Sequence, residues 1–98
     1  MKNTDDLLEQ LTEENPDALL ADGFLEAFVG IHRRFGQPAL AAYDYDKCIE
    51  ILMRDMSYEE AVEFFEFNTI GSWMGEHTPV FVELGERHGQ NRYDPLQN

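Results

Sequence analysis

The chain has 98 residues, and 43% of them are apolar, which is enough for one modest hydrophobic core. Twenty acidic residues against seven basic ones give a net charge of −13, which disfavours direct binding to nucleic acid or to an anionic membrane. No stretch of about 18 apolar residues is present, and Met1-Lys2-Asn3 leads into acids, so we expect neither membrane insertion nor secretion. The single cysteine, Cys48, forms no internal disulfide, which fits a reducing cytoplasm.

The acidic charge is concentrated toward the two ends of the sequence. Residues 1–26 hold eight acids and one base, residues 58–98 hold eight acids and two bases, and residues 27–57 hold four of each. Self-repulsion of this kind costs stability, so the acidic flanks need either a function or a tolerant fold.

The first fifteen residues have the pattern of a short helix. Thr4 is the expected N-cap, and the acids that follow it favour the positive end of the helix dipole. The helix has a narrow apolar stripe of Leu7, Leu8 and Leu11. Pro16 ends it, because a proline forces the preceding residue out of helical geometry. We expect residues 1–21 to form an acidic helical arm.

Residues 24–43 predict a β-hairpin. Residues 24–31 alternate between two faces as a strand does, although Phe24, Ala27, Phe28 and Ile31 also fit the spacing of a helix. Gly36-Gln37-Pro38 marks a turn, and residues 39–43 form a short second strand. The loop of this hairpin spans residues 33–38.

Two helices and one strand are expected to follow. Asp44 or Asp46 caps a helix over residues 45–56, whose core-facing stripe consists of Cys48, Ile49, Leu52, Met53 and Met56. Ser57 and Glu60 form a capping box, which starts a second helix over residues 58–70, and Gly71 or Gly75 ends it. Residues 79–84 alternate as the last strand.

The elements together predict an α+β fold with a small three-stranded, mostly antiparallel sheet. Two adjacent core helices, at residues 45–56 and 58–70, and a short N-terminal helix complete it. We expect a single compact domain over residues 22–85, and a polar, flexible tail over residues 86–98.

An acidic row is the first candidate for a functional surface. Glu59, Glu63 and Glu66 are spaced to share one helix face, and Glu60 lies beside them, with no lysine four residues away to pair with any of them. Such a row is either a solvated helix face or a surface that imitates the phosphates of a nucleic-acid strand. A second acidic patch consists of Asp44, Asp46 and Glu50.

The sequence offers little support for metal or enzyme chemistry. Asp44 and Asp46 can approach a divalent cation, but helix capping explains them better because no further oxygen ligands follow at metal-site spacing. His32, His77 and His88 lack the spacing of a zinc site, and Cys48 belongs to an apolar stripe. Hydrolase, phosphate-loop and dinucleotide motifs are absent. We therefore expect a non-enzymatic protein without a cofactor.

Three sequence runs carry a resemblance to a known group of proteins: Tyr43–Leu52 (YDYDKCIEIL), Glu59–Asn68 (EEAVEFFEFN) and Gly71–Pro79 (GSWMGEHTP). Residues 22–84 resemble a family of short hypothetical proteins common in bacteriophage and prophage genomes. The resemblance implies a phage protein that acts in the bacterial cytoplasm, and it implies no activity or catalytic residue. Small acidic phage proteins often block host factors, including nucleases and defence complexes, by occupying basic grooves.

The leading hypothesis is a binding protein that inhibits or modulates a host factor with a basic surface. Its contacts are the acidic row of Glu59, Glu60, Glu63 and Glu66 and the second patch. The alternative is a small homo-oligomer that binds an anionic small molecule, such as a signalling nucleotide, between subunits, because aromatic residues are dense for so small a core. The residues expected to form that pocket are Arg33, Arg34, Lys47, Arg54, Tyr43, Tyr45 and Trp73.

Overall fold

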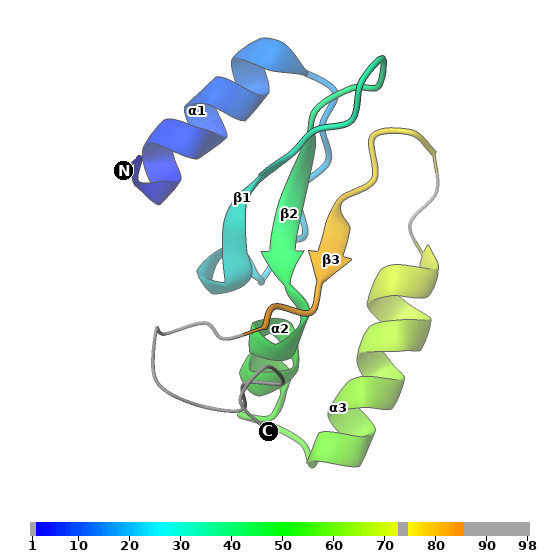
Figure 1. Cartoon of the computed structure of the whole chain (residues 1–98). Helices are drawn as coiled ribbons and strands as arrows, with labels where there is room; N and C mark the ends of the chain where they lie inside the picture. The colour runs from blue at the N-terminus through cyan, green and yellow to red at the C-terminus, as the bar shows by residue number, and fades with distance from the viewer. Residues whose placement is uncertain (1, 73–74, 86–98) are drawn as a thin grey trace, which may run out of the picture.

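The computed structural model describes residues 2–72 and 75–85, and these form an α+β fold (Figure 1). The chain begins with α1 (Thr4–Glu14), passes through a 3-10 turn, η1 (Leu25–Ala27), and enters the sheet at β1 (Phe28–His32) and β2 (Leu40–Asp44). The helices α2 (Tyr45–Leu52) and α3 (Tyr58–Phe64) follow, and α3 continues through η2 (Phe65–Thr69) and η3 (Ile70–Ser72) before β3 (Val80–Val82). The predicted fold class is confirmed, whereas the predicted tail, residues 86–98, lies outside the described residues.

The sheet has β2 at its centre, between β1 and β3. β1 runs antiparallel to β2, as the hairpin prediction requires, but β3 runs parallel to β2, with Ala42 opposite Val80. The sheet is therefore mixed, and the expectation of a mostly antiparallel sheet is corrected at β3. The reason lies in the connection, because the helical segment between β2 and β3 is long enough to cross over and bring the chain back in the same direction.

Several element boundaries differ from the sequence pattern. The sequence of residues 24–27 fitted both a strand and a helix. In the structure Phe24 precedes the η1 turn, which takes up residues 25–27, so the strand begins only at Phe28. The two core helices are shorter as regular α-helices than predicted and end at Leu52 and Phe64. α1 is capped by Asn3 rather than Thr4, because the Asn3 side chain accepts the backbone N–H of Asp6 at 2.8 Å.

The hydrophobic core is organised around Phe65, whose side chain is fully buried. Its ring makes edge-to-face contacts with Phe24, Tyr45 and Phe81, at centroid distances of 5.4, 5.5 and 5.1 Å. Leu11 of α1 belongs to the same core. Because edge-to-face contacts are directional, Phe65 fixes how η2 and α3 lie against α2 and β3.

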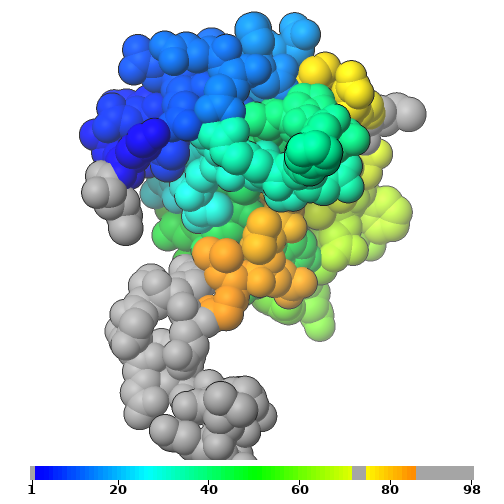
Figure 2. Space-filling model, turned by 45° about the horizontal axis from the view of Figure 1, so that its top comes forward, coloured from blue at the N-terminus to red at the C-terminus, as the bar shows by residue number. Residues whose placement is uncertain are grey.

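Asn15, the residue after α1, is buried and joins three parts of the chain. Its Nδ2 donates to the backbone carbonyl of Ala39 at 2.8 Å and lies 3.1 Å from Nδ1 of His77. The backbone N–H of Leu19 donates to the carbonyl of His77 at 3.1 Å. Figure 2 shows the result, with the hairpin (green) at the surface between the N-terminal segment (blue) and the segment before β3 (yellow).

No helix among residues 2–72 and 75–85 is both long enough and apolar enough to span a membrane.

Candidate functional site

α3 begins with the capping box that the sequence predicts. Ser57 Oγ accepts the backbone N–H of Glu60 at 3.2 Å, and the Glu60 carboxylate accepts the backbone N–H of Ser57 at 3.0 Å. The bond from the Ser57 backbone lowers the pKa of Glu60 from its ordinary value, because it stabilises the ionised carboxylate. The box therefore fixes the start of the helix and keeps a negative charge one turn before Glu63.

The chain widens into a π-helical turn at η2, and Glu66 is part of this turn. Tyr45 of α2 donates a hydrogen bond from its hydroxyl to Glu66 Oε2 at 2.9 Å. The pKa of Tyr45 is raised to about 12, chiefly because the side chain is partly buried and secondly because of this hydrogen bond. Glu66 is thus turned toward α2, and the predicted acidic row is not one uniform stripe.

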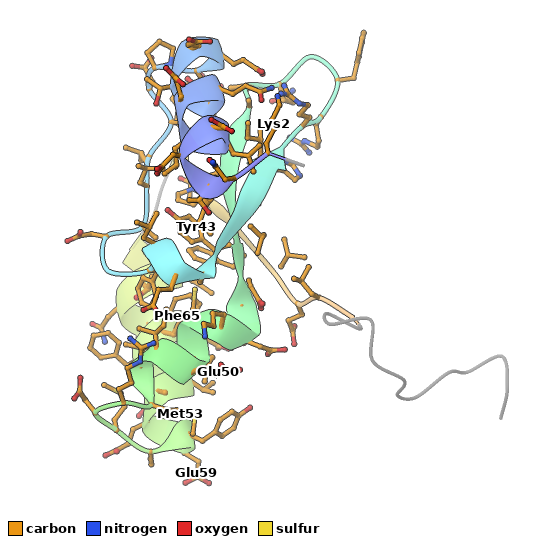
Figure 3. The ribbon with its side chains drawn as sticks, turned by 90° about the vertical axis from the view of Figure 1, so that its left-hand side faces the viewer. Lys2, Tyr43, Glu50, Met53, Glu59 and Phe65 are labelled. Carbon is orange, nitrogen blue, oxygen red and sulfur yellow. The ribbon has the colours of Figure 1, made fainter. Side chains whose placement is uncertain are left out.

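Glu59 and Glu63 are the members of the row that remain exposed and uncommitted. Within the part of the chain that the structure describes, neither side chain forms a hydrogen bond or an ion pair. Figure 3 places Glu59 at the end of the molecule away from α1, whereas Phe65 lies inside. These two carboxylates are therefore available to a partner without breaking an internal contact.

A groove of about 410 Å³ runs along the same helix. We call it the α3 groove, and its lining consists of Met56, Glu60, Glu63, Phe64, Phe67 and Asn68. Phe67 is 75% exposed and Phe64 is 41% exposed, although a phenylalanine normally gains about 2 kcal/mol or more from burial. The groove therefore offers two aromatic rings with carboxylates beside them, which suits a ligand that is both apolar and cationic.

The second predicted acidic patch is not a single surface. Asp44 is buried and caps α2, accepting the backbone N–H of Lys47 at 3.2 Å. Glu50 is exposed and pairs with Lys47, whose Nζ lies 3.7 Å from its carboxylate, and Asp46 is exposed in the first turn. The capping role expected for Asp44 is confirmed, and only Asp46 and Glu50 of the patch face solvent.

Within one chain, the described residues of the predicted inter-subunit anion pocket are spread over both ends of the sheet (Figure 1). Arg33 pairs with Glu14 through Nη1 and Nη2 of its guanidinium, and Arg54 pairs with Glu26 at 3.0 and 3.2 Å. Tyr43 is buried, with its hydroxyl accepting the backbone N–H of Ala21. Lys47 and Arg54 lie on and after α2, whereas Arg33 and Arg34 lie on the hairpin loop at the other end of the sheet (Figure 1). Trp73 lies outside the described residues.

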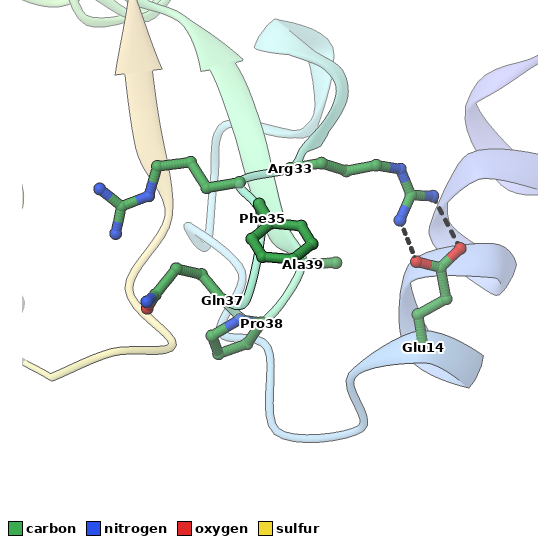
Figure 4. A pocket seen from close by; sticks show the side chains of 7 residues that line it. Glu14, Arg33, Phe35, Gln37, Pro38 and Ala39 are labelled. Atoms are coloured by element: carbon green, nitrogen blue, oxygen red, sulfur yellow. Dashed lines mark hydrogen bonds and ion pairs between the residues drawn. The ribbon is translucent and has the colours of Figure 1, made fainter.

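The hairpin loop forms a second concave surface, of about 430 Å³. It is lined by Glu14, Arg33, Arg34, Phe35, Gln37, Pro38 and Ala39. Figure 4 shows Arg33 reaching across to Glu14. Hydrogen bonds from Arg33 and, to a smaller extent, from Gln10 lower the pKa of Glu14 to about 2. Phe35 is fully exposed beside it.

Cysteine and histidine side chains do not assemble a reactive centre. Cys48 is fully buried, and burial raises the pKa of its thiol to about 12, so the nucleophilic thiolate is suppressed. Among the described residues, no group of three or more histidine, cysteine, aspartate or glutamate side chains is placed to hold a metal ion.

Sequence reasoning predicted the acidic residues on this helix but did not predict the α3 groove beside them. The available signal was the width of the apolar band, since Phe64 and Phe67 lie off the core-facing stripe. Phe35 was also missed, although its position in the loop, directly before Gly36-Gln37-Pro38, was a signal of exposure because loops run over the protein surface.

Comparison with known proteins gave no family model, no curated protein and no solved structure that matches this chain.

Proposed function

We propose that this chain is a non-enzymatic binding protein whose α3 groove takes a cationic segment of another protein. The observation that carries the proposal is the pair of exposed rings, Phe64 and Phe67, beside the carboxylates of Glu60 and Glu63. Aromatic side chains that fill a partner's pocket supply most of the affinity at protein interfaces, and the surrounding charges supply selectivity and association rate.

This surface is better suited to binding a cationic protein segment than to imitating nucleic acid inside a partner's binding groove. A mimic of a phosphate row needs evenly presented carboxylates, but Glu60 is held by its cap and Glu66 by Tyr45. The groove beside them is lined by two phenylalanine rings, which imitate no phosphate. The partner therefore has lysine or arginine side chains flanking at least one large apolar side chain.

The setting of the proposed function comes from the resemblance to short phage and prophage proteins. In that setting the partner is a bacterial protein with a basic surface, and occupation of that surface inhibits or modulates the host factor. Because both faces of such a contact are charged, the affinity falls as salt screens the attraction.

The proposal is tested by calorimetric titration with an amphipathic peptide of alternating lysine and leucine residues. The Glu59→Lys/Glu63→Lys variant should bind this probe at least ~10-fold more weakly than the original chain. The matched control is Glu9→Lys/Glu13→Lys, which alters two exposed glutamates at the same spacing on α1 and changes the net charge by the same amount. Equal weakening in both variants would mean that net charge alone attracts the probe, and the α3 groove would lose its role.

A further inference from the structure

The tip of the β1–β2 hairpin combines an aromatic ring with positive charge, whereas the α3 groove combines aromatic rings with negative charge. We call residues 33–38 the hairpin tip. The backbone N–H of Gln37 donates to the carbonyl of Arg34 at 3.0 Å, and Gly36 has a φ of +74°, which together define a β-turn with glycine at its third position. This turn places Phe35 at the outermost corner, where its ring is fully exposed. The tip therefore presents an exposed aromatic ring directly after two arginines, Arg33 and Arg34.

Arg34 gives the hairpin tip an available positive charge. Its side chain is exposed, and its guanidinium forms no hydrogen bond or ion pair with another residue in the ranges 2–72 and 75–85. Arg33, by contrast, is engaged by Glu14. In a chain of net charge −13, a free guanidinium next to an exposed phenylalanine is the feature that matches an acidic, aromatic groove.

We infer that the hairpin tip of one molecule seats in the α3 groove of a second copy of this chain. Phe35 would pack between Phe64 and Phe67, and Arg34 would meet Glu63, the carboxylate of the groove that has no partner among the described residues. This inference rests on the proposed function, since it assigns the same groove a second occupant. We expect the association to be weak, because a single loop makes the contact and the two molecules repel each other through their net charge.

The symmetry of this contact follows from where its two halves lie. The hairpin tip and the start of α3 are at opposite ends of the molecule (Figure 1), so they are different surfaces rather than one self-complementary patch. A contact between different surfaces is head-to-tail, and each added molecule leaves one tip and one groove unoccupied. A basic partner and a second copy would therefore compete for the groove.

The test uses two variants of the full chain. Phe35→Ala removes the aromatic ring of the hairpin tip, and Phe67→Ala removes one aromatic ring of the α3 groove. Both rings are largely exposed, so neither substitution should change the unfolding temperature. Sedimentation from about 10 µM to about 1 mM should show growing mass for the original chain and a monomer for each variant alone. An equimolar mixture of the two variants should form a dimer and grow no further, because only one tip and one groove remain functional.

Three results would overturn the inference: a monomeric original chain over this range, undiminished association of either variant alone, or a mixture that stays monomeric. The lysine–leucine probe separates this inference from the proposed function. If the original chain is monomeric but Phe67→Ala weakens probe binding at least ~10-fold, only the self-association is wrong. If Phe67→Ala binds the probe as the original chain does, the groove is not the binding site and the proposed function fails.

Discussion

Tyr45 links the aromatic core to the acidic surface of α3. Its ring packs edge-to-face on Phe65, while its hydroxyl donates to Glu66. The sequence pattern assigned Tyr45 to an alternative ligand pocket and gave no sign of this contact, because Glu66 lies 21 positions further along the chain. A hydrogen bond between distant residues depends on tertiary packing, so no local pattern predicts it.

The raised pKa of Tyr45 makes stability depend on alkaline pH in a defined direction. The folded value of about 12 exceeds the ordinary value of 10.0, so the folded state holds this proton more tightly than the unfolded state does. The stabilisation is complete below pH 10 and is lost as the pH rises toward 12. Urea unfolding should show a steeper alkaline loss for the original chain than for Tyr45→Phe, and equal slopes would contradict the assignment. Tyr43, whose pKa is also raised by burial, contributes equally to both proteins.

Glu14 gives the corresponding prediction in acid. Its pKa of about 2 lies below the ordinary value of 4.5, so the stabilisation is present above pH 4.5 and is lost as the pH falls toward 2. Arg33→Gln should return the pKa of Glu14 toward its ordinary value, as followed by carboxyl NMR titration. Arg54→Gln removes the comparable pair with Glu26 and serves as the control. An unchanged pKa of Glu14 in Arg33→Gln would show that another group holds the carboxylate.

At the scale of elements, the helical turn at η2 decides the shape of the candidate site. Phe65 and Thr69 are buried there, while Phe67 and Asn68 line the α3 groove. The capping box of Ser57 and Glu60 was predictable because it depends only on residues three apart. The π-helical turn was not predictable, because it forms where Phe65 enters the aromatic core. The direction of β3 was hidden for a similar reason, since three alternating residues do not define whether a strand is parallel.

Gly71 is required by the close approach of the chain after η2. A Cβ placed on Gly71 would lie 2.9 Å from the backbone oxygen of Glu66, which is too close for a carbon atom. Gly71→Ala should therefore lower the free energy of unfolding by about 1–3 kcal/mol, although alanine normally favours a helix over glycine. Gly85→Ala is the matched control, because a Cβ there meets nothing within 4 Å. A stabilised Gly71→Ala variant in urea unfolding would contradict the described geometry.

At the scale of the whole molecule, acidic charge lies in the two ends of the sequence, and residues 27–57 between them have no net charge. What an acidic surface can bind depends on the side chains that lie beside its carboxylates. Composition and spacing predicted an acidic surface on the second core helix, and Glu59 and Glu63 are exposed there. They could not predict that the adjacent surface is aromatic, because burial of Phe64 and Phe67 depends on how the helix is rotated against the sheet. The basic residues of the middle segment were grouped by sequence but are separated by the fold, where Glu14 and Glu26 neutralise Arg33 and Arg54.

The central claim is that the α3 groove, rather than acidic charge in general, binds a cationic partner. The most direct measurement is a backbone amide NMR titration of the full chain with the lysine–leucine peptide at about 0.1 M salt. We expect the shift changes to concentrate between Met56 and Asn68 and to leave the exposed acids of α1 unchanged. Shift changes of equal size along α1 and α3 would mean diffuse attraction to net charge and would contradict the claim.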